Sequence, residues 1–445
     1  IAYTQWGAVL ANRVEIATPV NSLNRIAEGL HLMQFGHSPY AGSALHAPPL
    51  LLAALEPILG GKNSLIPTIF SSGLRSIAAV APFVMADVLG AYLVYHIAHR
   101  MLHTGIDLAA EAPQAQRSDS CREGAGDECV PRTSAEESSS QARCALGCAR
   151  LCGVIYLMNP FTVAVCVGGV WSALENLALI CAFYGATYRS PTLAALGLAG
   201  ASYLAVHPLL LTVPIARALI VGVDPVHSSR SRAACMPKSS HAVWMFLAML
   251  ALFSGGLMAL SAVAMRDHSP LSEWLAKTYG FMLTIEDLTP NLGMHWYLFI
   301  ELFQFFRPFF LLAMLIQPLL LVTPLTIRFN HRPLFCAVMM LIMISIFKPY
   351  PSVSDAGLYL SLLPMFGAQL VNMRFGFLVV NGFLATTVMA PVFWHLWINT
   401  GVANSNFYYS ITLVYAAAQA ILLVDCVGST VKYDQRAFRS AQKQE

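Results

Sequence analysis

Long blocks of apolar residues, separated by short polar stretches, make up most of this 445-residue chain. Most blocks are about 17 to 25 residues long, the length that an α-helix needs to cross a hydrocarbon core of roughly 30 Å. A transmembrane β-barrel would instead show short segments of alternating hydrophobicity. The pattern therefore predicts an all-α fold, a polytopic transmembrane helical bundle of about ten to twelve spans.

Windows of about 19 residues place the individual spans. The predicted spans are residues 78–98, 154–169, 171–187, 193–206, 209–223, 242–265, 296–316 (or as far as 325), 334–347, 358–371, 377–397 and 411–427. Residues 50–59 form a shorter apolar stretch that suits an additional short or re-entrant segment.

Two polar segments interrupt this pattern. Residues 105–142 are rich in Ser, Glu, Arg, Gly and Gln, so they predict a disordered linker, which we place on the cytosolic side. Residues 11–48 carry aromatic and histidine side chains among prolines and glycines, which suits an ordered lumenal loop at the membrane surface. The predicted organisation is an N-terminal membrane region (1–104), the linker (105–142), the helical bundle (143–428) and a cytosolic tail (429–445).

Basic residues beside the short loops predict the orientation, because cytosolic loops carry an excess of Lys and Arg. Four basic stretches qualify, and they contain Arg230, Arg232 and Lys238; Arg328 and Arg332; Arg374; and Lys432, Arg436, Arg439 and Lys443. If all four are cytosolic, the polar loops at 286–291, 348–355 and 399–406 all lie on the lumenal side. We therefore expect these three loops to share a site.

Composition supports a membrane protein and excludes several function classes. The chain is 57% hydrophobic and 11% charged, whereas a soluble globular protein is roughly a quarter charged. The net charge of +3 is scattered, so a nucleic-acid partner is not expected. The ten cysteines lack zinc-site spacing, and we expect no metal and no cofactor. Phosphate-loop, His-Glu-x-x-His, Gly-x-Ser-x-Gly, caspase-type and Asp-x-Asp motifs are all absent, which predicts a chain without catalytic residues of its own.

The first of the three loops lies within residues 279–293 and contains Glu286, Asp287 and Asn291 just before a long apolar run. Asp287 and Asn291 are candidates for binding a polar ligand. The same residues also fit a simple turn and helix N-cap, where a carboxylate is favourable. The sequence leaves both interpretations open.

The second loop, residues 346–355, reads Ile-Phe-Lys-Pro-Tyr-Pro-Ser-Val-Ser-Asp. Its two prolines predict a tight turn. Lys348 and Asp355 could form an ion pair or meet a phosphate, and both are candidate site residues. Asp87 and Glu175, which lie inside apolar stretches, are interpreted as structural.

The third loop lies within residues 394–409, which combine aromatic side chains with three asparagines. Trp and Tyr at such a position usually anchor a helix at the membrane interface. The asparagines are candidates for binding, because a neutral amide offers donors and an acceptor to sugar or phosphate oxygens without a buried charge. His395 and Phe407 belong to the same candidate set.

Several motifs of the chain resemble the PIG-U family in order and spacing. They are Val-Glu-Ile-Ala-Thr-Pro-Val (14–20), Glu-Gly-Leu (28–30) with Ser-Pro-Tyr-Ala-Gly (38–42), Leu-Met-Asn-Pro-Phe (157–161), and residues 279–293, 346–359 and 394–409. The family also has an apolar span before the first motif, which this sequence lacks, and linker 105–142 resembles an insertion.

This resemblance implies a non-catalytic, multi-pass subunit of the glycosylphosphatidylinositol (GPI) transamidase in the endoplasmic reticulum membrane. Its implied partners are the other transamidase subunits, including a caspase-like catalytic subunit, the GPI lipid and membrane lipids. The implied fold is similar to that of the lipid-dependent membrane glycosyltransferases (GT-C-like). Asn404 and Asn406 are the implied contacts to the GPI headgroup or its phosphates.

Two rival functions remain open from the residues alone. A glycosyltransferase using a dolichol-linked sugar could take Glu15, or Glu286 and Asp287, as its carboxylates. The absence of Asp-x-Asp opposes that alternative. A transporter would show an inverted repeat and broken helices near the midplane, and the sequence has no clear repeat.

Overall fold

The computed structural model describes residues 5–59, 77–111, 134–222 and 236–442, which form helices and no strand. The first half contains α1 (Gln5–Ala11), α2 (Leu23–Gln34), α3 (Pro49–Leu59), α5 (Ile77–Glu111), α6 (Ser134–Met158), α7 (Pro160–Gly168), α8 (Ser172–Thr187), α9 (Pro191–Leu204), η2 (His207–Leu211), α10 (Thr212–Val221) and α11 (Met236–Ala264). The second half contains α12 (Leu271–Leu275), η3 (Ala276–Gly280), α13 (Phe281–Thr284), α14 (His295–Glu301), η4 (Gln304–Phe306), α15 (Arg307–Arg328), α16 (Pro333–Phe347), α17 (Val353–Leu362), η5 (Leu363–Phe366), α18 (Gly367–Leu370), α19 (Gly376–Trp394), η6 (His395–Asn399) and α20 (Ser405–Gln442).

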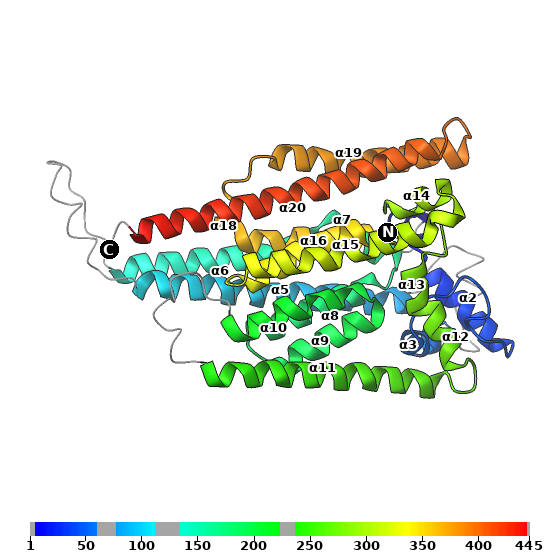
Figure 1. The fold of residues 1–445 in the computed structure, drawn as a ribbon, viewed down its shortest axis with the longest axis horizontal. Helices are drawn as coiled ribbons and strands as arrows, with labels where there is room; N and C mark the ends of the chain where they lie inside the picture. Colours follow the sequence, from blue (N-terminus) through cyan, green and yellow to red (C-terminus); the bar gives the residue numbers. More distant parts are fainter. Residues whose placement is uncertain (1–4, 60–76, 112–133, 223–235, 443–445) are drawn as a thin grey trace.

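The long helices run side by side along the long axis of the molecule (Figure 1). The short helices α2, α3 and α12 to α14 gather at one end, and the C-terminus lies at the other (Figure 1). We call the end with the short helices the loop end. The predicted all-α membrane bundle is confirmed.

Fewer helices are long enough to span a membrane than the sequence predicted. In the described ranges five qualify by length and composition, over Val80–Leu102, Ser240–Ala264, Gln304–Arg328, Gly376–Asn399 and Ser405–Arg439. A sixth is the pair Ala145–Met158 and Pro160–Gly168, which is bent by 42°. The remaining apolar helices, such as α16, are shorter than 18 residues. The predicted count of about ten to twelve spans also includes these shorter apolar helices.

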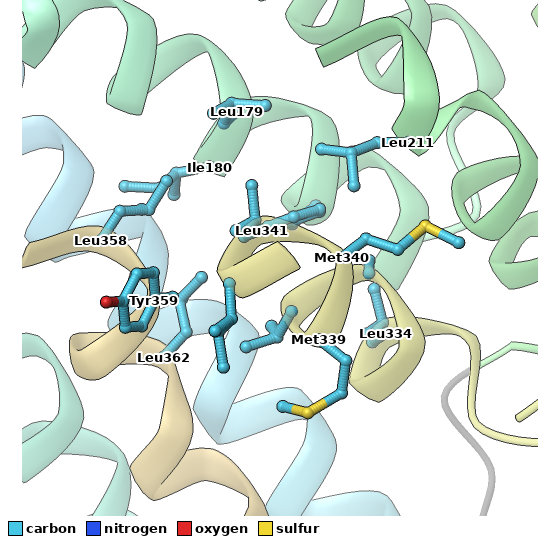
Figure 2. Packing of buried hydrophobic residues seen from close by; sticks show 14 of the residues in the cluster. Leu179, Ile180, Leu211, Leu334, Met339, Met340, Leu341, Leu358, Tyr359 and Leu362 are labelled. Carbon is cyan, nitrogen blue, oxygen red and sulfur yellow. The ribbon is translucent and has the colours of Figure 1, made fainter. Parts of the chain in front are cut away.

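The shorter helix α16 is buried inside the bundle. Every residue of α16 from Pro333 to Ile346 is buried. Leu341 of α16 lies among Leu179 of α8, Leu211 of η2 and Leu358 of α17 (Figure 2). A helix that is apolar on all sides is either a span or a core helix, and hydropathy alone does not separate the two.

The predicted start of the span at 296–316 is wrong, because the helix breaks at Leu302, whereas the extension to residue 325 agrees with the observed helix. Helix α14 ends at Glu301, and Leu302 and Phe303 are extended, with ψ of 133° and 137°. Pro308 lies in the first turn of α15. Inside a continuous helix its ring would clash with the carbonyl group of residue 304, so the apolar span starts at Gln304 instead.

Several predicted boundaries differ from the structure. The ends of the predicted linker are helical, since α5 extends to Glu111 and α6 begins at Ser134. Ala109 and Ala110 favour helix, as do Glu136 and Glu137 near a helix N-terminus. The rest of the linker lies outside the described residues. The predicted tail continues α20 without a break to Gln442, and the predicted lumenal loop 11–48 contains helix α2.

Helices α8 and α9 approach each other so closely that glycine is required. A Cβ atom at Gly197 would lie 2.4 Å from the backbone nitrogen of Ala182, and one at Gly185 would lie 2.3 Å from that of Ala194. Gly255 of α11, in contrast, has no atom within 4 Å of its Cβ position.

We therefore expect Gly197→Ala to lower the free energy of unfolding by about 1–3 kcal/mol, because the backbones must separate. Gly255→Ala is the matched control and is expected to raise it slightly, since alanine favours helix. Thermal unfolding of the purified protein in detergent would compare them. Equal melting temperatures for the two variants would contradict the close packing of α8 and α9.

Candidate functional site

The three polar loops predicted to share a compartment lie at the same end of the molecule. The Tyr350 hydroxyl donates to the backbone oxygen of Asp287 (3.0 Å), which joins the first two loops. The Tyr297 hydroxyl donates to Oδ1 of Asn406, which joins the third loop to α14.

The basic stretches that fall within the described residues also lie close to one another, away from the three polar loops. Arg332 pairs with Asp434 (2.9 Å), and the backbone nitrogen of Arg374 donates to Asp425. Arg436 donates to Asn372 (2.7 Å). Arg230, Arg232 and the Lys238 side chain fall outside the described residues. The grouping matches the sequence prediction, while the assignment of the loop end to the lumen stays a prediction.

The first loop is a turn whose polar groups bind one another. Asp287 accepts from the backbone nitrogen (2.8 Å) and the hydroxyl of Thr289, and it pairs with Arg25 of α2 (3.0 Å). Asn291 is buried, and its amide bonds the oxygen of Thr289 (3.1 Å) and the nitrogen of Gly293 (2.7 Å). The turn interpretation of this loop accounts for both candidate residues.

These partners lower the pKa of the Asp287 carboxyl. Burial raises the pKa of this carboxyl, but the bonds from Thr289 and the Arg25 guanidinium outweigh burial and hold the pKa below its usual range. A lowered pKa in the folded state contributes stability that is fully present above the unfolded value of about 3.9. That contribution is lost as the pH falls through the lower pKa of the folded state.

We therefore expect acid to loosen the contact between α2 and the first loop only below about pH 4. The contribution is of order 1 kcal/mol, because both side chains are partly exposed. Melting temperatures measured from pH 7 to pH 3 should fall less steeply for Asp287→Asn than for the wild type. Parallel curves would contradict the role assigned to this ion pair.

The second loop is held by a buried charge cluster, which we call the Lys348 cluster (Lys348, Asp355 and Glu175). Nζ of Lys348 lies 3.1 Å from Oδ1 of Asp355 and 3.6 Å from Oε1 of Glu175. The other Asp355 oxygen accepts from the backbone nitrogen of Ser352 (3.0 Å), completing a capping box at the start of α17. Burial opposes the charge of Lys348, but the two carboxylates outweigh burial and raise its pKa.

Little space surrounds the Lys348 cluster. Two cavities of about 20 Å³ each border Lys348 and Glu175. Such a volume holds about one water molecule, and neither a sugar ring nor a phosphate fits. In this conformation the cluster holds α8, α16 and α17 together. Lys348 and Asp355 were candidates from the sequence analysis, which did not indicate that Glu175 is their partner.

Behind the third loop lies a second buried ion pair. Arg13 binds both carboxylate oxygens of Glu15 (2.7 and 3.0 Å), and the Tyr408 hydroxyl donates to one of them (3.2 Å). The Arg13 guanidinium lies 5.9 Å from the ring centre of Trp394. These contacts fix the start of α20 and the end of α19 against the N-terminal segment. The sequence analysis did not identify Arg13 or Tyr408 as residues that support the site, although Tyr408 lies within residues 394–409, which contain the third loop.

The third loop itself is exposed, together with the ends of the two long apolar helices that it joins. We call His395, Asn404, Asn406 and Phe407 the amide tip. All four are exposed, and 51% of Phe407 is accessible. Asn404 accepts from the backbone nitrogen of Asn406 (3.1 Å), which caps the first turn of α20, and His395 contacts Asn399 (2.8 Å).

The eight candidate residues thus separate into two groups. Asp287, Asn291, Lys348 and Asp355 are buried or partly buried, and their polar atoms bind other parts of the chain. The four residues of the amide tip are exposed, although Asn404, Asn406 and His395 also make hydrogen bonds within the loop end. They lie beside the start of α20, where the helix dipole favours anions. This tip can bind a polar, anionic headgroup at the end of two membrane-length helices.

Comparisons with known proteins agree on one family. A family model described as "GPI transamidase subunit PIG-U" matches residues 1–415. The human "GPI-anchor transamidase component PIGU" is 29% identical over 426 residues, which cover 94% of this chain and 87% of the human protein. The Saccharomyces cerevisiae "GPI transamidase component GAB1" is 28% identical over 417 residues, covering 94% and 86%. The Schizosaccharomyces pombe "GPI transamidase component GAB1 homolog" is 28% identical over 440 residues, covering 98% and 90%.

Proposed function

The chain belongs to the PIG-U family of GPI transamidase subunits, and from that premise we propose that it binds and positions the GPI lipid within the transamidase. In this role it acts in the endoplasmic reticulum membrane beside the other subunits, of which a caspase-like one performs catalysis. The observation that carries the lipid-binding role is the amide tip, which exposes Asn404 and Asn406 at the ends of two helices of membrane-spanning length.

The amide tip suits a phosphorylated glycan attached to a lipid. Amide groups bind sugar hydroxyls and phosphate oxygens without carrying a charge that must be desolvated. The start of α20, at Ser405, adds the partial positive charge of a helix N-terminus, which favours phosphate. In this proposal the exposed ring of Phe407 contacts the lipid where its acyl chains meet the glycan. A headgroup held here leaves its lipid tail alongside α19 and α20.

The other candidate residues act as supports in this proposal. Asp287 and Asn291 shape the first loop, and Lys348 and Asp355 hold the second. These four side chains are buried or partly buried and bind the chain itself, so in this proposal they position the loop end and do not contact lipid.

The rival function, a glycosyltransferase using a dolichol-linked sugar, requires a carboxylate that can take a proton. Glu15 is buried, with both oxygens bound by Arg13 and one also by Tyr408. Asp287 is bound by Thr289 and Arg25. A carboxylate whose lone pairs are occupied and whose charge is balanced is a poor general base. Glu286, the third carboxylate of this rival, is exposed and accepts a hydrogen bond from the Thr284 hydroxyl (3.2 Å). The contacts of Glu15 and Asp287 therefore support a non-catalytic role for these two residues.

Lipid analysis after depletion of the protein in its own cells tests the proposal, together with immunoblots of a GPI-anchored reporter. We expect complete GPI, bearing ethanolamine phosphate, to accumulate alongside uncleaved reporter precursor. A truncated lipid that lacks mannose would identify a glycosyltransferase and overturn the proposal.

A further inference from the structure

Helix α19 lies at the edge of the bundle, and its principal neighbour is α20 (Figure 1). The side facing α20 is closely packed. The Phe383 ring meets that of Tyr415 edge-on, with centroids 5.7 Å apart, and a Cβ atom at Gly382 would lie 2.8 Å from the Cβ of Ala418. The contacts of this side leave the opposite face of α19 turned outward.

The outer face of α19 (Phe377, Asn381, Leu384 and Val388) combines large apolar side chains with an amide. Residues at this spacing lie on one side of a helix. Phe377, Leu384 and Val388 are 85%, 59% and 49% exposed, and Asn381 is exposed between them. Within the described ranges the Asn381 amide makes one hydrogen bond, from Nδ2 to the backbone oxygen of Phe377 (2.7 Å). Its side-chain oxygen and second N–H need partners from outside the chain.

Lipid tails do not supply such partners. Asn381 lies five residues inside α19, roughly 7.5 Å along the axis from Gly376, within the apolar segment Gly376–Asn399. Hydrocarbon offers no donor or acceptor, so an amide that faces only lipid costs free energy. The exposed apolar residues of α11 provide a contrast, since Leu252, Leu260 and Val263 present a surface that lipid covers at no such cost.

We propose that the outer face of α19 binds a transmembrane helix of another GPI transamidase subunit, with Asn381 hydrogen-bonded across the interface. Asn side chains stabilise helix pairs in membranes through such bonds, and small residues nearby let the helices approach. Ala385, one turn from Asn381, is exposed and provides that space. The inference rests on the proposed function for the class of partner. In this arrangement the partner helix runs alongside α19, whose C-terminal end leads into the amide tip.

Co-purification from cells that express the whole complex tests this interface. Asn381→Leu removes the amide and keeps an apolar surface, and Ala385→Trp blocks close approach. Ala251→Trp places the same bulk on the exposed face of α11 as a control. We expect both α19 variants to lose at least fivefold of the co-purified transamidase subunits, with unchanged amounts of the chain, while the control retains them. Full co-purification with both α19 variants would overturn the inference.

A photoreactive benzoylphenylalanine gives a second readout that does not depend on how the bulky variant folds. Placed at Leu384 in the otherwise wild-type complex, it is expected to form an adduct with a transamidase subunit, whereas at Leu252 it should label lipid. Labelling of lipid alone at Leu384 would overturn the inference. If the wild-type chain co-purifies with no transamidase subunit, the proposed function itself fails, which is a distinguishable result.

Discussion

Lys348→Met is expected to lower the free energy of unfolding by about 3–5 kcal/mol, because it leaves two buried carboxylates without their cation. Asp355 lies 3.1 Å and Glu175 3.6 Å from the Lys348 Nζ atom, and all three side chains are less than a fifth exposed. Lys348→Arg keeps the charge and is expected to cost less. Thermal unfolding of each variant in detergent measures the difference.

A second substitution separates the loss of charge balance from the loss of packing. In Lys348→Met combined with Glu175→Gln, one of the opposed carboxylates is gone, so part of the lost stability should return. Wild-type stability in Lys348→Met, or no recovery in the double variant, would contradict the role of the Lys348 cluster in holding α8, α16 and α17 together.

Asn404→Asp and Asn406→Asp are each expected to lower attachment of GPI to a reporter by roughly tenfold or more, while the amount of protein stays near that of the wild type. An unfavourable change of 1.4 kcal/mol already gives a factor of ten in binding, and like charges placed together cost several kcal/mol. The new carboxylate would face the phosphates of the lipid and would also weaken the anion site at the start of α20.

Serine at the same positions is the matched control, because it keeps a neutral polar group. Asn404→Ser and Asn406→Ser should lose less activity than the aspartate variants. Flow cytometry of a surface reporter, normalised to the amount of the chain, provides the comparison. Wild-type activity in both aspartate variants at equal expression would remove the amide tip from the proposed site.

Hydropathy predicted the helices of this fold better than it predicted their roles. The windows at 242–265 and 377–397 coincide with the spans Ser240–Ala264 and Gly376–Asn399. Helix α16 looks the same to such a window, although it is shorter than these spans and buried inside the bundle, because the interior of a bundle is as apolar as lipid. The break at Leu302 depends on Pro308 and on local backbone geometry, which an average over a window does not detect.

The arrangement of the site was predictable only in part, for a related reason. Basic residues flanking the loops predicted which loops lie together. Each span carries the chain to the opposite side of the membrane, so the position of one loop determines that of the next. Partners distant in sequence could not be predicted: Glu15 meets Tyr408 across 393 positions. The short motif around Asp287 and Asn291 fitted a turn and a binding site equally well from the sequence, and the hydrogen bonds to Thr289 and Gly293 show the turn.

Photocrosslinking from Phe407 in the assembled complex tests the central claim most directly. Benzoylphenylalanine at Phe407 would be compared with the same residue at Phe438, an exposed position near the other end of α20. Our account predicts that isolated adducts at Phe407 contain GPI, identified by mass spectrometry of inositol and ethanolamine phosphate, and that adducts at Phe438 do not. Absence of GPI from the Phe407 adducts, or equal labelling at both positions, would contradict the claim that this end of the chain holds the lipid headgroup.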